Sequence, residues 1–209
     1  MPFNKPNMVQ LRIELLGIYP AIWRRVVIPL SWNLEQLHLA IQAAFNWWNY
    51  HLHEFNIGGL IFTDIKSLDG LLDSAEMQNF DEKTVRLQDF DPFAAVSFLY
   101  RYDFGDRWEH LVEIEKIFPA GVFLPNATCI EGARARPPED VGGIQGYQDF
   151  LCALAESSHP RHCELKKWCG GYFDPEWFDL SIINKDLKNA LKPAVRRRLY
   201  QPKPKRVLL

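Results

Sequence analysis

The sequence contains few cysteines, and no two of them are spaced as a metal-binding or redox pair. The thiols belong to Cys129, Cys152, Cys163 and Cys169, and no Cys-x-x-Cys motif occurs. A chain of 209 residues can also bury a core without disulfide bridges. We therefore expect four reduced, unpaired thiols and a cytoplasmic protein.

Long apolar runs and the common catalytic motifs are absent as well. Every uncharged stretch is interrupted by Asn, His, Pro or Gly before it could cross a bilayer, and the N-terminal residues do not form an apolar leader. The motifs Gly-x-Ser-x-Gly and His-Glu-x-x-His and the dinucleotide fingerprint do not occur. We expect no membrane partner and no organic cofactor, and the sequence assigns no catalytic residue.

Acidic residues are missing from the C-terminal end. Residues 1–187 hold 16 basic and all 26 acidic residues, a formal charge of −10, whereas residues 188–209 carry +8. We therefore predict a single α+β domain over 1–187 and a basic, flexible tail over 188–209. The acidic body repels polyanions, so we expect any contact with nucleic acid to be made by the tail. The candidate nucleic-acid-binding residues are Arg196, Arg197, Arg198, Lys203, Lys205 and Arg206. A solvated tail that binds nothing is the alternative.

Apolar and polar residues alternate in the first half of the chain in the way that strands require. The pattern predicts strands over 9–15, 22–28 and 51–57, and a helix over 33–46 with Asn33 as its N-cap. Residues 58–94 are rich in Gly, Asp and Ser, which indicates an irregular excursion with one short strand near 85–87.

A hairpin over 96–117 is the clearest element of the second half. A three-residue loop, in which Gly105 needs a positive φ, pairs Tyr102 with Trp108 and Tyr100 with His110. After it, residues 119–146 are expected to form a loop, followed by helices over 147–156, over 162–169 and from Pro175 onward with Asp174 as N-cap. The order of elements predicts an α+β fold with a mixed, mainly antiparallel, roll-like sheet and helices packed on one side.

Histidine and aspartate gather in two of these segments. Imidazole and carboxylate are ligands of divalent cations, which makes the following residues candidates for a metal site: His51, His53, Asp103, Asp106 and His110. Because His51 and His53 are two residues apart, a strand would place both on one face. The alternative is that the aspartates stabilise the hairpin turn and that His110 packs in the core.

Glu139 and Asp140 form a second candidate group, in the segment Pro137-Pro-Glu-Asp-Val-Gly-Gly143. Two carboxylates on a rigid loop can hold a cation. They can equally favour the positive N-terminus of a following helix. The segment lacks the Lys and Ser/Thr of a phosphate-binding loop.

Several motifs occur in the order seen in a known family. They are Ile22-Trp-Arg-Arg25, His51-Leu-His-Glu-Phe55, Tyr102-Asp-Phe-Gly-Asp106 with Trp108-Glu-His110, Pro137-Pro-Glu-Asp-Val-Gly-Gly143 and Phe173-Asp-Pro-Glu176. Over about 9–179 the chain resembles the plasmid pRiA-type ORF-three-like family, found on plasmids and beside insertion sequences, without an assigned function. The resemblance implies a prokaryotic setting and an α+β roll. Where relatives often have a second cysteine, this chain has Arg136, which can neutralise Glu139 or Asp140.

Three classes of function follow from these features, and the aromatic content suggests the third, a small-molecule-binding roll lined by Trp23, Trp47, Trp48, Tyr100 and Trp108. The first is a non-catalytic accessory or binding protein of a mobile element, whose body contacts a protein or small ligand and whose tail contacts nucleic acid. The second is a metal-dependent hydrolase that uses the His/Asp cluster to activate water. Convergence of the candidate ligands in space distinguishes the first two.

Overall fold

A computed structural model describes residues 7–68, 79–90, 97–119, 126–192 and 201. One eight-stranded sheet has the strand order β5-β4-β3-β6-β7-β1-β2-β8, and only the β4–β5 pair is parallel. The elements, in chain order, are β1 (Met8–Leu15), β2 (Ile22–Pro29), α1 (Leu34–Phe45), β3 (His53–Ile57), β4 (Leu60–Thr63), the 3₁₀ turn η2 (Ile65–Leu68), β5 (Asn79–Asp81), the 3₁₀ turn η3 (Leu87–Asp89), β6 (Ser97–Tyr102), β7 (Trp108–Phe118), β8 (Thr128–Ala133), α2 (Gly143–Ala155), α3 (His162–Trp168) and α4 (Leu180–Lys188).

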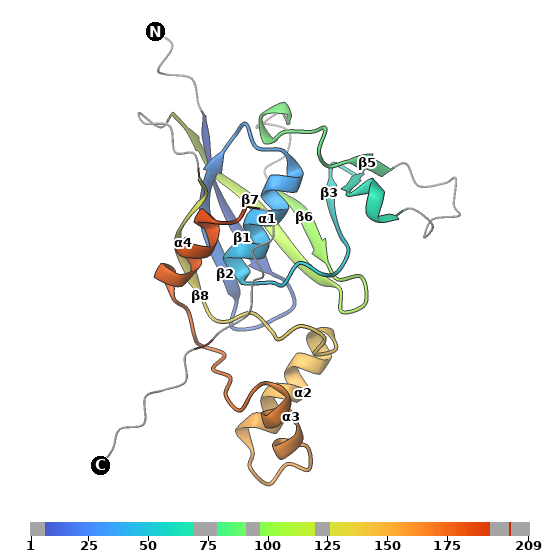
Figure 1. Ribbon diagram of the computed structural model, residues 1–209, viewed down its shortest axis with the longest axis vertical. Helices are drawn as coiled ribbons and strands as arrows, with labels where there is room; N and C mark the ends of the chain where they lie inside the picture. The colour runs from blue at the N-terminus through green and yellow to red at the C-terminus, as the bar shows by residue number, and fades with distance from the viewer. Residues whose placement is uncertain (1–6, 69–78, 91–96, 120–125, 193–200, 202–209) are drawn as a thin grey trace.

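Helices α1 and α4 cover one face of the sheet, while α2 and α3 extend beyond its end (Figure 1). The predicted α+β fold with a mainly antiparallel sheet and helices on one side is confirmed. In the described part of the chain, no helix is long and apolar enough to span a membrane.

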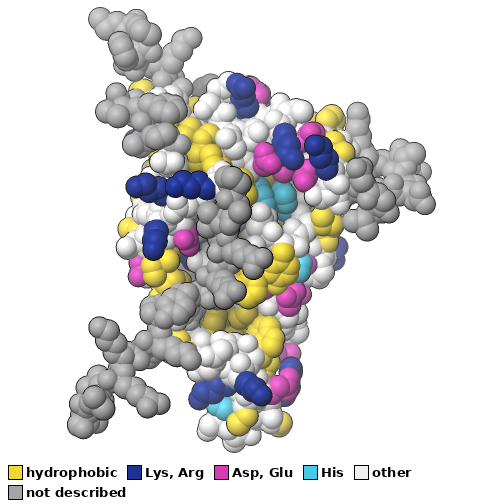
Figure 2. Space-filling model, in the orientation of Figure 1, with side chains coloured by type: hydrophobic (Ala, Val, Ile, Leu, Met, Phe, Trp, Pro, Cys, Tyr) yellow, Lys and Arg dark blue, Asp and Glu magenta, His cyan; other side chains and the backbone are white. Residues whose placement is uncertain are grey.

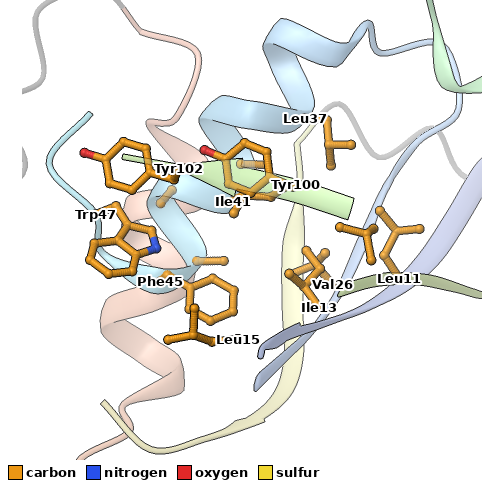
Figure 3. Close-up of a cluster of buried hydrophobic side chains, with 14 of the residues drawn as sticks. Leu11, Ile13, Leu15, Val26, Leu37, Ile41, Phe45, Trp47, Tyr100 and Tyr102 are labelled. Carbon is orange, nitrogen blue, oxygen red and sulfur yellow. The ribbon is translucent and has the colours of Figure 1, made fainter. Parts of the chain in front are cut away.

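The core lies between α1 and the covered face of the sheet. Alternate residues of β1, including Leu11, Ile13 and Leu15, are fully buried and meet Ile41 and Phe45 of α1 (Figure 3). The predicted N-cap residue, Asn33, starts this helix and forms a capping box: the Asn33 side chain accepts from the Gln36 amide, and the Gln36 side chain accepts from the Asn33 amide. The opposite face of the sheet carries ion pairs such as that of Arg25 with Glu115.

The predicted hairpin register is confirmed, but its loop is longer than expected. Tyr102 pairs with Trp108 and Tyr100 with His110, yet the strands are joined by the five residues 103–107. The left-handed positions are Asp103 and Arg107, with φ of 59° and 56°. The prediction that Gly105 needs a positive φ is therefore wrong, because Asp103 makes the sharp bend instead.

Three other local predictions are wrong. Strand β4 occupies part of the expected irregular excursion, and a 3₁₀ turn replaces the strand expected near 85–87. Strand β8 lies inside the expected loop, where its short run containing Gly132 shows no alternation. Helix α4 begins after Asp179, whose side chain accepts from the Ile182 amide, and not after Asp174. Pro175 lies in a turn, and its carbonyl accepts from the Ala135 amide.

Candidate functional site

Three segments that are distant in the sequence meet beyond the end of α1. His51 lies in the segment that joins α1 to β3, Asp103 directly follows β6, and Glu139 with Asp140 precede α2. Asp103 and Asp140 both have left-handed backbones, with φ of 59° and 57°. Aspartate tolerates this conformation better than most residues, which explains why the chain can turn sharply at both carboxylates.

Arg136 fixes the loop that carries Glu139. Its Nε and Nη2 donate to the carbonyl of Asn46, just beyond the C-terminus of α1, at 3.2 and 3.0 Å. A cation is favourable there because the helix dipole is negative at that end. The guanidinium also lies 4.6 Å from the ring of Trp47. Burial lowers the pKa of Arg136 to about 10, so the side chain keeps its charge at neutral pH.

Each of the three carboxylates is held by one oxygen and leaves the other directed at His51. Asp103 Oδ1 accepts from the Gly105 amide at 2.9 Å. Asp140 Oδ2 accepts from the Tyr50 hydroxyl at 2.6 Å, and Glu139 Oε1 accepts from the Trp48 amide at 2.6 Å. The protein thus orients the carboxylates through one set of oxygens and leaves the second set for another partner.

The free oxygens surround the Nε2 atom of His51. Asp140 Oδ1 lies 3.2 Å from Nε2, Asp103 Oδ2 lies 3.4 Å away, and Glu139 Oε2 lies 3.9 Å away. Neither His51 Nε2 nor Glu139 Oε2 forms a hydrogen bond, although both atoms are buried. Two ligand atoms about 2.1 Å from one ion in tetrahedral geometry are about 3.4 Å apart, so the first two separations match those around a shared cation.

Electrostatics at this cluster leave a negative excess. The three carboxylates carry −3 when ionised, and the Arg136 Nη2 atom, 3.9 Å from Glu139 Oε1, supplies the only buried positive charge beside them in the described residues. Burial raises the pKa of Glu139, and the attraction of Arg136 opposes that rise only in part. A divalent cation would balance the remaining −2.

Comparisons with known proteins place the chain among relatives. It is similar to "Uncharacterized protein y4hQ" of Sinorhizobium fredii (strain NBRC 101917 / NGR234), with 39% identity over 182 residues, 86% of this chain and 90% of the relative. The "Crystal Structure of Protein of Unknown Function MM3350 from Methanosarcina mazei Go1" matches with a TM-score of 0.72 and 35% identity, covering 84% of this chain and 97% of that one. The family model described as "Plasmid pRiA4b ORF-3-like protein" matches residues 7–182.

The chain belongs to the plasmid pRiA4b ORF-3-like family. The resemblance read from the sequence motifs is therefore confirmed. All residues of the cluster lie inside the matched region.

In this ORF-3-like chain, two of the five predicted metal ligands come together. His51 and Asp103 meet, and Asp140 joins them from the second candidate group, with all three ligand atoms within 4.8 Å of one another. Glu139 completes the cluster. Asp106 stays outside, because its Oδ2 accepts from the Gly142 amide at 3.1 Å and so joins the hairpin to the loop before α2.

His53 and His110 are placed elsewhere. The expected shared face of His51 and His53 does not form, since β3 begins at His53 and His51 precedes it. The His53 ring stacks on His38 at 3.4 Å between centroids, and its Nε2 lies 2.7 Å from Glu82 Oε2. His110 is fully buried and accepts from the Trp47 indole through Nε2. Both histidines therefore have structural roles in the core.

The remaining sequence-based predictions concern the basic C-terminal residues and the cysteines. The six basic residues proposed for nucleic acid, Arg196, Arg197, Arg198, Lys203, Lys205 and Arg206, lie outside the described residues. Within 193–209 the structure describes only Gln201, whose side chain forms two hydrogen bonds with the backbone of Asp174. The four cysteines are unbridged, as expected.

Sequence reasoning missed the residues that hold the cluster in place. Tyr50 orients Asp140 through its hydroxyl, and its ring lies 4.2 Å from that of His51. The Trp48 amide orients Glu139. Neither residue belongs to a periodic pattern, and only their position directly before His51 could have suggested a role.

Proposed function

We propose that this protein binds a divalent cation through His51, Asp103 and Asp140, with Glu139 beside them. The observation that carries the proposal is the pair of buried atoms without a hydrogen bond, His51 Nε2 and Glu139 Oε2, which lie 3.9 Å apart. Buried polar atoms normally have partners, and a cation would satisfy both. One imidazole with several carboxylates suits Mn²⁺ or Zn²⁺.

A protonated His51 that forms ion pairs with the carboxylates is the competing explanation. The two explanations differ in what they predict for added metal. Under the metal proposal, purified protein stripped with a chelator and dialysed against Mn²⁺ or Zn²⁺ should regain one ion per chain by elemental analysis. Under the ion-pair explanation it should regain none.

Matched variants locate the ion. Asp103→Asn keeps the oxygen that accepts from the Gly105 amide and removes the charge of the free oxygen, so it should abolish retention of the metal. Asp149→Asn changes an exposed carboxylate on α2, outside the cluster, and should retain the ion like the wild type. Equal retention by both variants would contradict the assignment.

A bound cation is compatible with two functions, a binding protein and a hydrolase, and we favour the binding protein. The cluster consists of one imidazole and three carboxylates, so a hydrolase would use a water molecule activated by the cation. A binding protein needs no such step. Glu139 is the specific observation in favour of hydrolysis, because a buried carboxylate with a raised pKa and a free oxygen suits a general base. A hydrolase would require Glu139→Gln to abolish turnover of a substrate while the bound metal remains.

Nucleic-acid binding by the basic C-terminal residues is a separate proposal that rests on charge. The end of the chain carries +8 and no acid, while residues 1–187 carry −10. Such contacts would be electrostatic and independent of base sequence. The protein would then be an accessory factor that contacts DNA through its C-terminal end and binds a small ligand at the cation site.

A further inference from the structure

A pocket of about 520 Å³ opens beside the cluster. Its walls come from the segment after α1, from the loop that carries Glu139 and Asp140, and from the residues that follow α3. Most of its large side chains are aromatic: Trp48, Trp168, Tyr172 and Phe173. Figure 2 shows hydrophobic side chains gathered beside acidic ones where α2 and α3 meet the rest of the molecule.

Two tryptophans of this pocket are unusually accessible. Trp48 is 42% exposed and Trp168 is 48% exposed. Large aromatic surfaces that line a concave site next to polar groups are typical of ligand pockets. The volume lies within the range of sites for small organic molecules, about 300–1,000 Å³. An aromatic ligand bound here would be lined by both indoles.

The described residues of the pocket offer no free basic side chain for a phosphate chain. Arg136 is the one basic residue among the described lining residues. Its Nε and Nη2 donate to the Asn46 carbonyl and its Nη1 donates to the Pro137 carbonyl. A polyphosphate would also meet the carboxylates of Glu139 and Asp140. Among the described residues, an anionic head group would therefore find its positive charge in a cation bound by the cluster.

We propose that the ligand of this pocket is a flat aromatic acid whose oxygen atoms bind the cation while its rings lie between Trp48 and Trp168. The inference rests on the proposed cation site. With the cation in place, the cluster and Arg136 have no net charge, so a single carboxylate can approach. The same arrangement disfavours nucleotides, which carry several negative charges and would find one positive centre.

Calorimetric titration with 3-hydroxy-2-naphthoate tests the proposal, because this probe has two fused rings and a chelating carboxylate. The probe should bind to Mn²⁺-loaded protein and not to chelator-treated protein. Trp168→Ala and Trp48→Ala should each weaken the probe by at least about tenfold, as expected for a buried indole contact. Trp168→Ala, which lies outside the cluster, should leave the affinity for Mn²⁺ unchanged. Trp23→Phe, on the far face of the sheet, is the matched control and should bind as the wild type does.

Three results would overturn the proposal: equal binding with and without Mn²⁺, unchanged binding in both tryptophan variants, or tighter binding of ATP than of the naphthoate. Failure of the cation site itself is recognised separately, because Mn²⁺ titrated alone would then give no heat and no bound ion. Retained Mn²⁺ binding together with no binding of the probe would reject the aromatic ligand and leave the cation site standing.

Discussion

The substitution Asp140→Asn distinguishes a metal site from a network of ion pairs, because the two explanations predict changes in metal-free stability of opposite sign. The amide keeps an oxygen for the Tyr50 hydroxyl, which donates to Asp140 at 2.6 Å. Asparagine also tolerates the left-handed backbone at this position. The substitution therefore changes charge and little else. Without metal, it removes repulsion among Asp103, Glu139 and Asp140, and the variant should be as stable as the wild type or slightly more stable.

The magnitude in the presence of metal follows from linkage. A cation at 100 times its dissociation constant stabilises the native state by about 2.7 kcal/mol. For a chain of this size, 1 kcal/mol corresponds to about 2–4 °C in Tm. The wild type should therefore gain about 5–11 °C, and Asp140→Asn should gain nothing.

Thermal melts at pH 8, with chelator and with Mn²⁺ or Zn²⁺, measure both effects. If His51 is instead a protonated partner of the carboxylates, Asp140→Asn removes an exposed ion pair and lowers stability by about 0.2–1 kcal/mol without metal. A lower Tm in chelator combined with no gain from metal in the wild type would refute the reasoning.

Three further predictions concern other parts of the chain. Gly143→Ala should destabilise the protein by about 1–3 kcal/mol, because φ is +67° and a Cβ would lie 2.8 Å from a backbone oxygen of the β6–β7 hairpin. Gly105→Ala should cost less, because its Cβ would meet only a side-chain oxygen, Asp103 Oδ1, at 3.2 Å. Equal denaturation midpoints for the two variants would contradict this. Burial lowers the pKa of His110 to about 4, below about 6.5 for a free imidazole. The unfolded chain thus takes up this proton first, and the contribution of His110 is lost as pH falls from about 6.5 toward 4. The Tm difference between the wild type and His110→Gln should shrink from pH 7.5 to pH 5, and a constant difference would reject this coupling. For the tail, fluorescence anisotropy with labelled duplex DNA should give a dissociation constant of about 10⁻⁴–10⁻⁶ M and a log–log salt slope near −4; a chain ending at Leu191 should lose this binding, and equal binding by both chains would reject the tail proposal.

A related protein offers an independent test of the cation site. The match to MM3350 of Methanosarcina mazei covers 97% of that protein, with 35% identity. If the cluster binds a cation in this chain, residues at equivalent positions in that protein are the natural place to repeat the metal titration. Agreement between the two proteins would make cation binding a property of more than one member.

Local sequence patterns determined the elements that depend on near neighbours. Alternation in β1 and β2, the N-cap at Asn33 and the register of the β6–β7 hairpin were all predicted, because each rests on contacts within one or two adjacent segments. Elements that depend on distant partners were missed. Strand β8 is stabilised by β2 and α4, and its own residues show no pattern that predicts either partner.

The same distinction holds for the candidate site. The sequence supplied His51 and Asp103 in one group and Glu139 with Asp140 in another, because only residue type and spacing were available. Tertiary structure alone decided that these groups meet, since the buried Arg136 fixes the loop before α2 to the end of α1. It also decided that His53 and His110 turn into the core. Ligand convergence is a long-range property, set by packing across the sheet, and a one-dimensional pattern does not contain it.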